Sequence, residues 1–386
     1  MKDSFQYLYA SIGTQFSWYL PDLIAHKLDF FGSKDFGSNI QYVWAHPQKD
    51  IIYLALSDGG PGKKGSNHSI LACSIDRNTG EPVILGSQQR VPYRPIHLCT
   101  DERGRNLFTA YNNPSSLSVH KIETNGDIGE KTIQLSRDQV GIFGHQVRVT
   151  PDGKTLIVVC RGYDATDTAS EQPGCLKLFD LEDGKLRDTK TISPFGGLGF
   201  GARHLDFHPN GNWFYLAIER QSELHTFKIG DDGIADNPLF TTSTLSKPLQ
   251  LGARQANSAI HLHPSGKFVY VSNRTYAAAP INAGVIPNGE DNIAVFEIDE
   301  ISFKPSLIQS VDTFGSLPRT FSIHKSGKML VAANSEAARK LNFNGKATSL
   351  PLSLVSYEIA ANGKLALKQQ INFHAKDKLL FWAGFL

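Results

Sequence analysis

The sequence carries a small set of side chains that could bind an anionic group and move a proton. They lie at the ends of strand-like segments and comprise His145, Arg161, Arg203, Glu219, Arg274 and Arg319. An arginine can hold a carboxylate or an oxyanion with two parallel hydrogen bonds. A carboxylate near arginines can accept a proton from water, and a histidine can pass a proton on near neutral pH. These residue types suit the attack of water on an ester-like carbonyl, if the fold brings them together.

A segment that recurs six times predicts how these side chains are positioned. Each copy is a short apolar strand, a polar turn and a second strand rich in Val, Ile, Leu and Tyr. Taken at the turn, the copies are anchored at Lys49, Gly104, Gly153, Gly211, Gly266 and Gly327. A further alternating strand with a polar turn follows each copy, as in CLKLFDLEDGKL from Cys175. Four strands in each unit of about 55 residues are typical of a β-propeller blade.

The two ends of the chain predict a seventh blade. Phe5–Ile12 and Leu379–Leu386 are both strand-like, and a ring has to cover its first and last sheet edges. We therefore expect an all-β, seven-bladed β-propeller with four antiparallel strands per blade, whose last blade is closed by both termini. Residues 1–386 would form a single domain. Six or eight blades are the alternatives.

Hairpin geometry predicts which residues share one rim. In a hairpin, the start of the first strand and the end of the second lie at the same face, opposite the turn. Counting eight residues either way from the anchors gives twelve positions from Gln41 to Ser335, and these include the six residues above. Neighbouring positions add His97, His204 and Asn273. Glu219 is the only carboxylate in this count. A single charged residue at a strand end is ordinarily just solvated surface, so the interpretation as a site rests on convergence from four blades.

A second group of histidines precedes the turns and should lie at the opposite face. It comprises His46, His208, His263 and His324. We expect these side chains to cap the turns rather than to bind a metal. The glycine-rich segment Gly59–Ser66 lacks the Gly-Lys-Ser/Thr ending of a phosphate loop and is predicted to be a flexible turn.

Composition narrows the classes of partner. The 39 basic and 37 acidic residues nearly balance, which gives no electrostatic footprint for nucleic acid or an anionic membrane. The four cysteines form no CxxC pair, and no stretch approaches the roughly 20 apolar residues that span a bilayer. We expect a soluble, cytoplasmic protein that acts on a small molecule.

Several segments resemble the propeller-type lactonase family, which includes 6-phosphogluconolactonases and fungal 3-carboxy-cis,cis-muconate lactonising enzymes. The segments that carry the resemblance are RHLDFHPNG from Arg203, PRTFSIHKSGK from Pro318, YVSNR from Tyr270 and FGHQVRVTPDGK from Phe143. The resemblance implies that His145, Arg203, Glu219 and Arg274 are the active-site residues. Gly-Ala-Arg-His replaces the family's Gly-Pro-Arg-His at Arg203. Three rim insertions look long: Pro21–Asn39, Tyr163–Gly174 and Thr275–Asp291.

These residues predict a metal-independent lactone hydrolase that acts on a small sugar-acid or related carboxylated lactone. Glu219 would be the general base, Arg203 and Arg274 would stabilise the oxyanion, and His145 would shuttle the proton. The expected substrate-binding residues are Arg161, His204, Asn273, Arg319 and His97. No metal or other cofactor is expected. The alternatives are a muconate-type cycloisomerase on the same scaffold and a non-catalytic binding propeller.

Overall fold

The computed structural model describes residues 6–247, 253–277, 285–341, 346–375 and 377–386. These residues form six four-stranded antiparallel sheets, one antiparallel sheet of five strands and one small additional sheet of three strands. The chain divides into two compact units. The first contains Thr14–Trp18 and Phe31–Arg203, and the second contains Gln6–Gly13, Tyr19–Phe30 and His204–Leu386. The expectation of a single domain stays a prediction.

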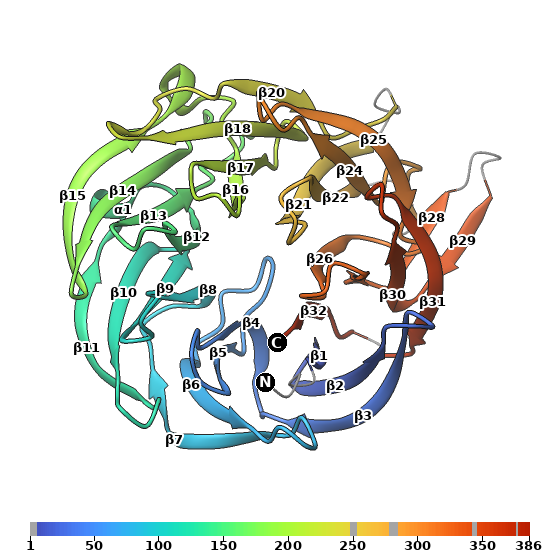
Figure 1. Cartoon of the computed structure of the whole chain (residues 1–386), viewed down its shortest axis with the longest axis horizontal. Helices are drawn as coiled ribbons and strands as arrows, with labels where there is room; N and C mark the ends of the chain where they lie inside the picture. Colours follow the sequence, from blue (N-terminus) through green and yellow to red (C-terminus); the bar gives the residue numbers. More distant parts are fainter. Residues whose placement is uncertain (1–5, 248–252, 278–284, 342–345, 376) are drawn as a thin grey trace. The chain divides into compact units, whose positions relative to one another are not determined.

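Three sheets belong to the first unit, and their strands are connected in chain order (Figure 1). The first contains β4 (Asn39–Ala45), β5 (Ile51–Ser57), β6 (His68–Ile75) and β7 (Pro82–Arg90). The second contains β8 (Pro95–Thr100), β9 (Asn106–Asn112), β10 (Ser115–Ile122) and β11 (Ile128–Leu135). The third contains β12 (Gly144–Val149), β13 (Thr155–Cys160), β14 (Cys175–Glu182) and β15 (Lys185–Ile192). Helical structure is limited to α1 (Arg137–Val140) and the 3-10 turn Pro194–Gly197 in the described part of the chain.

Three sheets belong to the second unit, apart from the first two residues of β16. One contains β16 (Ala202–Phe207), β17 (Trp213–Ile218), β18 (Glu223–Gly230), the short β19 (Gly233–Ile234) and β20 (Phe240–Ser243). The next contains β21 (Ala253–Leu262), β22 (Phe268–Ala277), β24 (Asn292–Ile298) and β25 (Pro305–Asp312). The third contains β26 (Pro318–Ile323), β27 (Met329–Asn334), β30 (Leu352–Ile359) and β31 (Leu365–Phe373).

The two ends of the chain share the remaining sheet, as predicted. Its order is β3-β2-β1-β32, with β1 (Leu8–Ile12), β2 (Gln15–Asp22), β3 (Lys27–Asp35) and β32 (Leu380–Phe385). β1 and β32 pair antiparallel, with Leu8 opposite Phe385, and lie side by side in Figure 1. The apolar LLFWAGF segment thus covers the inner edge of β1.

One predicted rim insertion is wrong. Pro21–Asn39 was expected to be a long insertion at the rim, but most of it forms the end of β2 and all of β3. β3 is the outermost strand of its sheet, and most of its residues are exposed. An outer strand therefore lacks the apolar alternation that marks a half-buried strand in a sequence.

The turns that join the first two strands of a repeat are held by their own residues and by contacts with another sheet. Gly104, Gly266 and Gly327 adopt positive φ values of 62°, 75° and 70°, as expected for these turns. The preceding histidines cap the turns, as predicted: His46 Nδ1, for example, accepts the backbone N–H groups of Gln48 and Lys49 at 3.0 and 3.1 Å.

In His208 and His263, the other ring nitrogen contacts the turn of the following sheet. The Nε2 atom of His208 lies 3.1 Å from the carbonyl oxygen of Gly266, and that of His263 lies 2.9 Å from Gly327. A Cβ atom on Gly266 or Gly327 would come within 2.7 or 2.4 Å of these rings. Each glycine is therefore required by a side chain about 60 residues away as well as by its own φ angle.

Buried tyrosines connect neighbouring sheets in the same way. The hydroxyl of Tyr215 donates to the carbonyl of Phe303 at 2.8 Å, and that of Tyr270 donates to Gly363 at 2.8 Å. Their rings are buried in apolar clusters, so each side chain combines apolar burial with a satisfied hydroxyl group. In the first unit, Tyr53 donates to Gly126 at 3.0 Å.

The small additional sheet joins two connections of the second unit. Its order is β23-β28-β29, and its strands are β23 (Val285–Ile286), β28 (Ala338–Leu341) and β29 (Ala347–Leu350). β23 pairs parallel to β28, with Val285 opposite Arg339. β23 lies in the predicted Thr275–Asp291 insertion, of which residues 278–284 lie outside the described residues. The connection that carries β28 and β29 is an insertion that the sequence analysis missed.

Candidate active site

The second unit holds a buried ion pair between two of the predicted catalytic residues. Glu219 directly follows β17, and Arg274 lies near the end of β22 in the next sheet. Arg274 Nη2 is 3.2 Å from Glu219 Oε1, and it donates to the carbonyl of Asn257 at 2.9 Å. Only 4% of the Arg274 side chain and 12% of the Glu219 side chain is exposed. Both charged groups are therefore largely shielded from water.

A second carboxylate lies near the same arginine. Burial raises the pKa of Glu336, and the positive charges of Arg319 and Arg274 partly oppose this shift. Glu336 follows β27 two residues after its last residue, Asn334. The expectation of a single carboxylate at this position was wrong because the count from the repeat stopped at Ser335. Including the residue directly after each counted position would have found Glu336.

The predicted residue Arg319 lies on β26, at the start of the inner strand of its sheet. Its guanidinium carbon lies 4.1 Å from the centre of the Phe381 ring, a distance typical of a cation–π contact. Phe381 belongs to β32. The backbone carbonyl of Arg319 also accepts a hydrogen bond from Ser258 Oγ at 2.7 Å. Two neighbouring strands therefore fix the position of Arg319.

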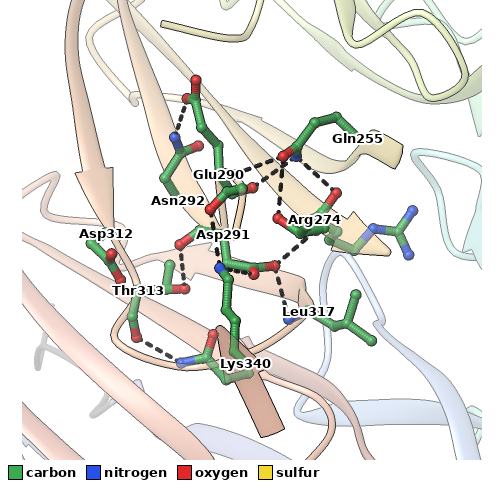
Figure 2. Close-up of polar contacts among 12 residues, drawn as sticks. Gln255, Arg274, Glu290, Asp291, Asn292, Asp312, Thr313, Leu317 and Lys340 are labelled. Atoms are coloured by element: carbon green, nitrogen blue, oxygen red, sulfur yellow. Dashed lines mark hydrogen bonds and ion pairs between the residues drawn. The ribbon is translucent and has the colours of Figure 1, made fainter. Parts of the chain in front are cut away.

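A buried polar network holds the backbone at Arg274 (Figure 2). Gln255 Nε2 donates to the Arg274 carbonyl at 3.0 Å. Asp291 Oδ1 accepts the backbone N–H of the following residue, Thr275, at 3.0 Å, and that of Leu317 at 3.1 Å. Figure 2 shows the Arg274 guanidinium pointing away from these contacts. The network therefore orients Arg274 and leaves its charged group to the site.

Lys340 completes this network from the additional sheet. Its Nζ atom lies 2.5 Å from Asp291 Oδ2 and donates to the carbonyl of Gly289 at 3.0 Å. Only 2% of the Asp291 side chain is exposed. Burial raises the pKa of Asp291, while Lys340 and the two backbone N–H groups act in the opposite direction. The sequence analysis found neither residue, because 49 positions separate them.

The first unit contains His145 and Arg161. His145 lies on β12 and stacks with Phe143 at a centroid distance of 6.2 Å. The guanidinium of Arg161 lies 5.6 Å from the centre of the same ring, and its Nη2 atom is 3.0 Å from Asp164 Oδ2. Phe143 therefore contacts both predicted residues. Asp164 comes from the predicted Tyr163–Gly174 insertion, which forms a loop with bridges such as Tyr163 to Gln172.

His97 and Arg203 form a second group in the first unit. His97 is fully buried, with its ring centre 4.1 Å from that of Tyr42 and 5.8 Å from that of Trp44. Burial and the charges of Arg148 and Arg203 lower the pKa of His97 well below its usual value. A neutral, fully enclosed imidazole favours a packing role over direct contact with a substrate. Arg203 is 1% exposed.

The two remaining predicted residues are also buried. The Asn273 amide donates to the Thr244 carbonyl and to Asn292 Oδ1, both at 2.8 Å, and accepts from Thr244 Oγ1 at 2.7 Å. Both of its N–H groups are thus used in connecting strands, which favours a structural role. His204 follows Arg203 on β16 and is 7% exposed.

The structure therefore brings Glu219 together with Arg274, and Glu336 lies near Arg274 and Arg319. In the other unit, it brings His97 near Arg203. The expectation that the residues of both units surround one mouth stays a prediction. Within the described ranges, no group of three or more His, Cys, Asp or Glu side chains is arranged to hold a metal ion. No helix in that part of the chain is long and apolar enough to cross a membrane.

Comparisons with known proteins connect this arrangement to a family. The family model described as "Lactonase, 7-bladed beta-propeller" matches residues 22–372. A 6-phosphogluconolactonase from Bacillus subtilis is 26% identical over 325 residues, which cover 81% of this chain and 83% of that protein. A 6-phosphogluconolactonase from Enterobacter is 24% identical over 304 residues, which cover 78% and 80% of the two chains.

Solved structures show the same fold. A Lactobacillus plantarum protein has a TM-score of 0.73 at 22% identity, with 99% of each chain covered. The Pseudomonas aeruginosa periplasmic gluconolactonase PpgL has a TM-score of 0.70 at 18% identity, with 96% of each chain covered. The predicted fold class is confirmed, and the chain belongs to the lactonase family of seven-bladed β-propellers.

Proposed function

We propose that this protein hydrolyses a small sugar-acid lactone and that Glu219 and Arg274 carry the reaction. The buried Glu219–Arg274 pair, held 3.2 Å apart in a member of the lactonase family, is the observation that supports this proposal. Relatives named 6-phosphogluconolactonase cover most of the chain, which favours hydrolysis in sugar catabolism over a muconate-type cycloisomerase or a binding propeller. A cytoplasmic location, and the absence of nucleic-acid and membrane partners, stay predictions.

Glu219 suits the role of general base. It would take a proton from water as the water oxygen attacks the lactone carbonyl carbon. Arg274 uses Nη2 for Glu219 and Asn257, while its Nε atom has no hydrogen-bond partner in the described structure. This N–H could therefore stabilise the oxyanion that forms on the carbonyl oxygen. Arg203, the second buried arginine of the prediction, is the further candidate for this role.

The ring C–O bond then breaks, and the departing alkoxide needs a proton. His145 is the proton donor that the sequence analysis predicts, because an imidazole exchanges protons near neutral pH. Glu336 is a second candidate, because burial raises its pKa and favours its protonated form. The product is an open-chain hydroxy acid. No metal or other cofactor takes part in this scheme.

Glu219→Gln tests the proposal. The amide keeps the shape of the side chain but accepts no proton, so we expect kcat to fall about 100-fold or more. Hydrolysis of glucono-δ-lactone and 6-phosphoglucono-δ-lactone would be followed by pH-stat, with the uncatalysed rate subtracted. Glu223→Gln is the matched control, because Glu223 begins β18 and pairs with His225 at 2.9 Å. It should leave kcat unchanged.

Near-full turnover of Glu219→Gln on the best lactone would refute the assignment of the base. A product assay in ¹⁸O-labelled water separates hydrolysis from cycloisomerisation, since only hydrolysis incorporates the solvent oxygen. Absence of the label from the product would refute a hydrolase.

A further inference from the structure

Arg94 is a partly buried cation without a nearby counter-charge. It lies in the first unit, in the connection between β7 and β8. Its Nη1 atom donates to Gln41 Oε1 at 2.9 Å, and Gln41 is a neutral amide. Among the described residues, no carboxylate forms an ion pair with Arg94. Burial lowers the pKa of Arg94 to about 10, so the protein destabilises the charged form of this side chain.

A chain of hydrogen bonds connects Arg94 to a second basic side chain, His68. Gln41 Nε2 donates to the Gly59 carbonyl at 3.3 Å, and the Gly59 N–H donates to Ser57 Oγ at 2.8 Å. His68 begins β6 and is 8% exposed, and its Nδ1 atom lies 2.8 Å from Ser57 Oγ. Burial lowers the pKa of His68, and the charge of Arg94 acts in the same direction while Asp58 opposes it. Arg94 and His68 are therefore two basic side chains joined through Gln41, Gly59 and Ser57.

The carboxylate that acts on His68 is engaged in its own loop. Asp58 Oδ1 accepts the backbone N–H groups of Ser66 and Asn67, both at 2.8 Å, and Oδ2 accepts from Ser66 Oγ at 3.2 Å. These hydrogen bonds lower the pKa of Asp58. Asp58 therefore serves its own loop and does not neutralise Arg94.

The same loop, Gly59–Ser66, contains a turn closed by backbone hydrogen bonds, as expected of this segment. Gly60 and Lys63 exchange two backbone hydrogen bonds, of 2.8 and 3.1 Å. Gln41 Nε2 donates to the carbonyl of Gly59 at 3.3 Å, so the amide that holds Arg94 is itself tied to the loop. Lys63 and Lys64 lie on the exposed part of this loop and add positive charge.

A desolvated guanidinium costs stability unless it gains a partner. Arg94 uses one of its five N–H donors on Gln41, and the rest of its planar fork suits an oxyanion. We propose that Arg94 and His68 form an oxyanion-binding subsite, oriented by Gln41, that takes a phosphate or carboxylate group of a ligand. Its use as a substrate subsite rests on the proposed lactonase function, whereas its affinity for a free anion does not.

Isothermal titration calorimetry of the full chain tests the subsite directly. Inorganic phosphate and malonate, titrated separately at constant ionic strength, distinguish the two sources of the oxyanion. We expect Arg94→Gln to weaken binding of the preferred anion about 10-fold or more, as for loss of a charge-assisted hydrogen bond. Arg94→Lys should weaken it less. Arg90→Gln is the matched control, since Arg90 ends β7 and is exposed.

Two results would overturn the subsite. The first is a wild-type protein that binds neither anion, and the second is equal binding by Arg94→Gln and Arg90→Gln. Circular dichroism of each variant would confirm that the fold is retained.

A kinetic comparison connects the subsite to catalysis. If the oxyanion is the phosphate of a substrate, Arg94→Gln should raise KM for 6-phosphoglucono-δ-lactone about 10-fold and leave KM for glucono-δ-lactone unchanged. An equal rise in KM for both lactones would contradict a phosphate subsite. A wild-type protein that hydrolyses neither lactone refutes the proposed function but leaves the anion titration valid. Intact hydrolysis without anion binding refutes the subsite alone.

Discussion

Lys340 and Arg94 are two cations with very different surroundings. Lys340 reaches a buried carboxylate, Asp291, at 2.5 Å and a backbone carbonyl at 3.0 Å. Arg94 reaches a neutral amide, Gln41, at 2.9 Å. The positive charge of Lys340 is compensated within the fold, and that of Arg94 is not. The first arrangement suits a structural connection, and the second suits a ligand.

The two cations also differ in what they hold in place. Through Asp291, Lys340 connects the additional sheet to the backbone N–H of Thr275, next to Arg274. It is therefore a positioning residue for the proposed site. Among the described residues, the Arg94 side chain is hydrogen-bonded only to Gln41, so its removal leaves no buried charge there without a partner.

Lys340→Met should produce the largest change in stability. The substitution leaves Asp291 as an uncompensated buried charge, and breaking a buried ion pair costs about 3–5 kcal/mol. The free energy of unfolding would be measured by guanidinium titration. Lys364→Met is the control, because Lys364 is exposed in the turn between β30 and β31. The double variant Asp291→Asn/Lys340→Met should recover part of the loss.

An equal free energy of unfolding for Lys340→Met and Lys364→Met would contradict the structural role of the ion pair. Because the network holds the backbone at Arg274, Lys340→Met should also lower kcat more than it changes KM for the lactone. A change in KM alone would place Lys340 in substrate binding instead.

The loss of stability caused by Lys340→Met should become smaller as the pH falls. Burial already raises the pKa of Asp291, and removal of Lys340 should raise it further. A carboxyl group whose pKa is higher in the folded state stabilises that state at low pH, and the contribution is lost as the pH rises through the raised pKa. A rise of the Asp291 pKa by one corresponds to about 1.4 kcal/mol in the free energy of unfolding.

Guanidinium titrations of wild type and Lys340→Met between pH 7 and pH 4 would measure this effect. If the difference in the free energy of unfolding between the two proteins stays constant over this range, Asp291 remains ionised without Lys340.

Arg94→Met should have the smallest effect on stability. It removes a charge that burial destabilises, so we expect a free energy of unfolding within about 0.5 kcal/mol of the wild-type value, or slightly above it. Thermal unfolding in the absence of phosphate would measure this. If Arg94→Met lowers the free energy of unfolding as much as Lys340→Met does, Arg94 stabilises the fold. The contrast between the two cations would then be wrong.

Much of the fold could be predicted from the sequence because its signals are local. A repeat of strand, turn and strand shows in the alternation of apolar residues, and Gly104, Gly266 and Gly327 have the positive φ expected of their turns. The turn-capping histidines were predictable for the same reason, since His46 Nδ1 accepts from residues two and three positions later. The repeat also placed Glu219 and Arg274 at matching strand ends, where they form an ion pair.

Tertiary structure decided the contacts that the repeat does not contain. β23 and β28 lie in insertions of two different sheets, and their parallel pairing brings Lys340 to Asp291. Glu336 lies one position beyond the counted strand end, and its proximity to Arg274 and Arg319 depends on how that connection folds. Whether Arg94 meets a carboxylate or an amide depends likewise on packing between two sheets. A repeat determines the spacing of strands along the chain. Whether a buried charge is compensated depends instead on which side chains meet across sheets. Local periodicity carries no information about these contacts between sheets.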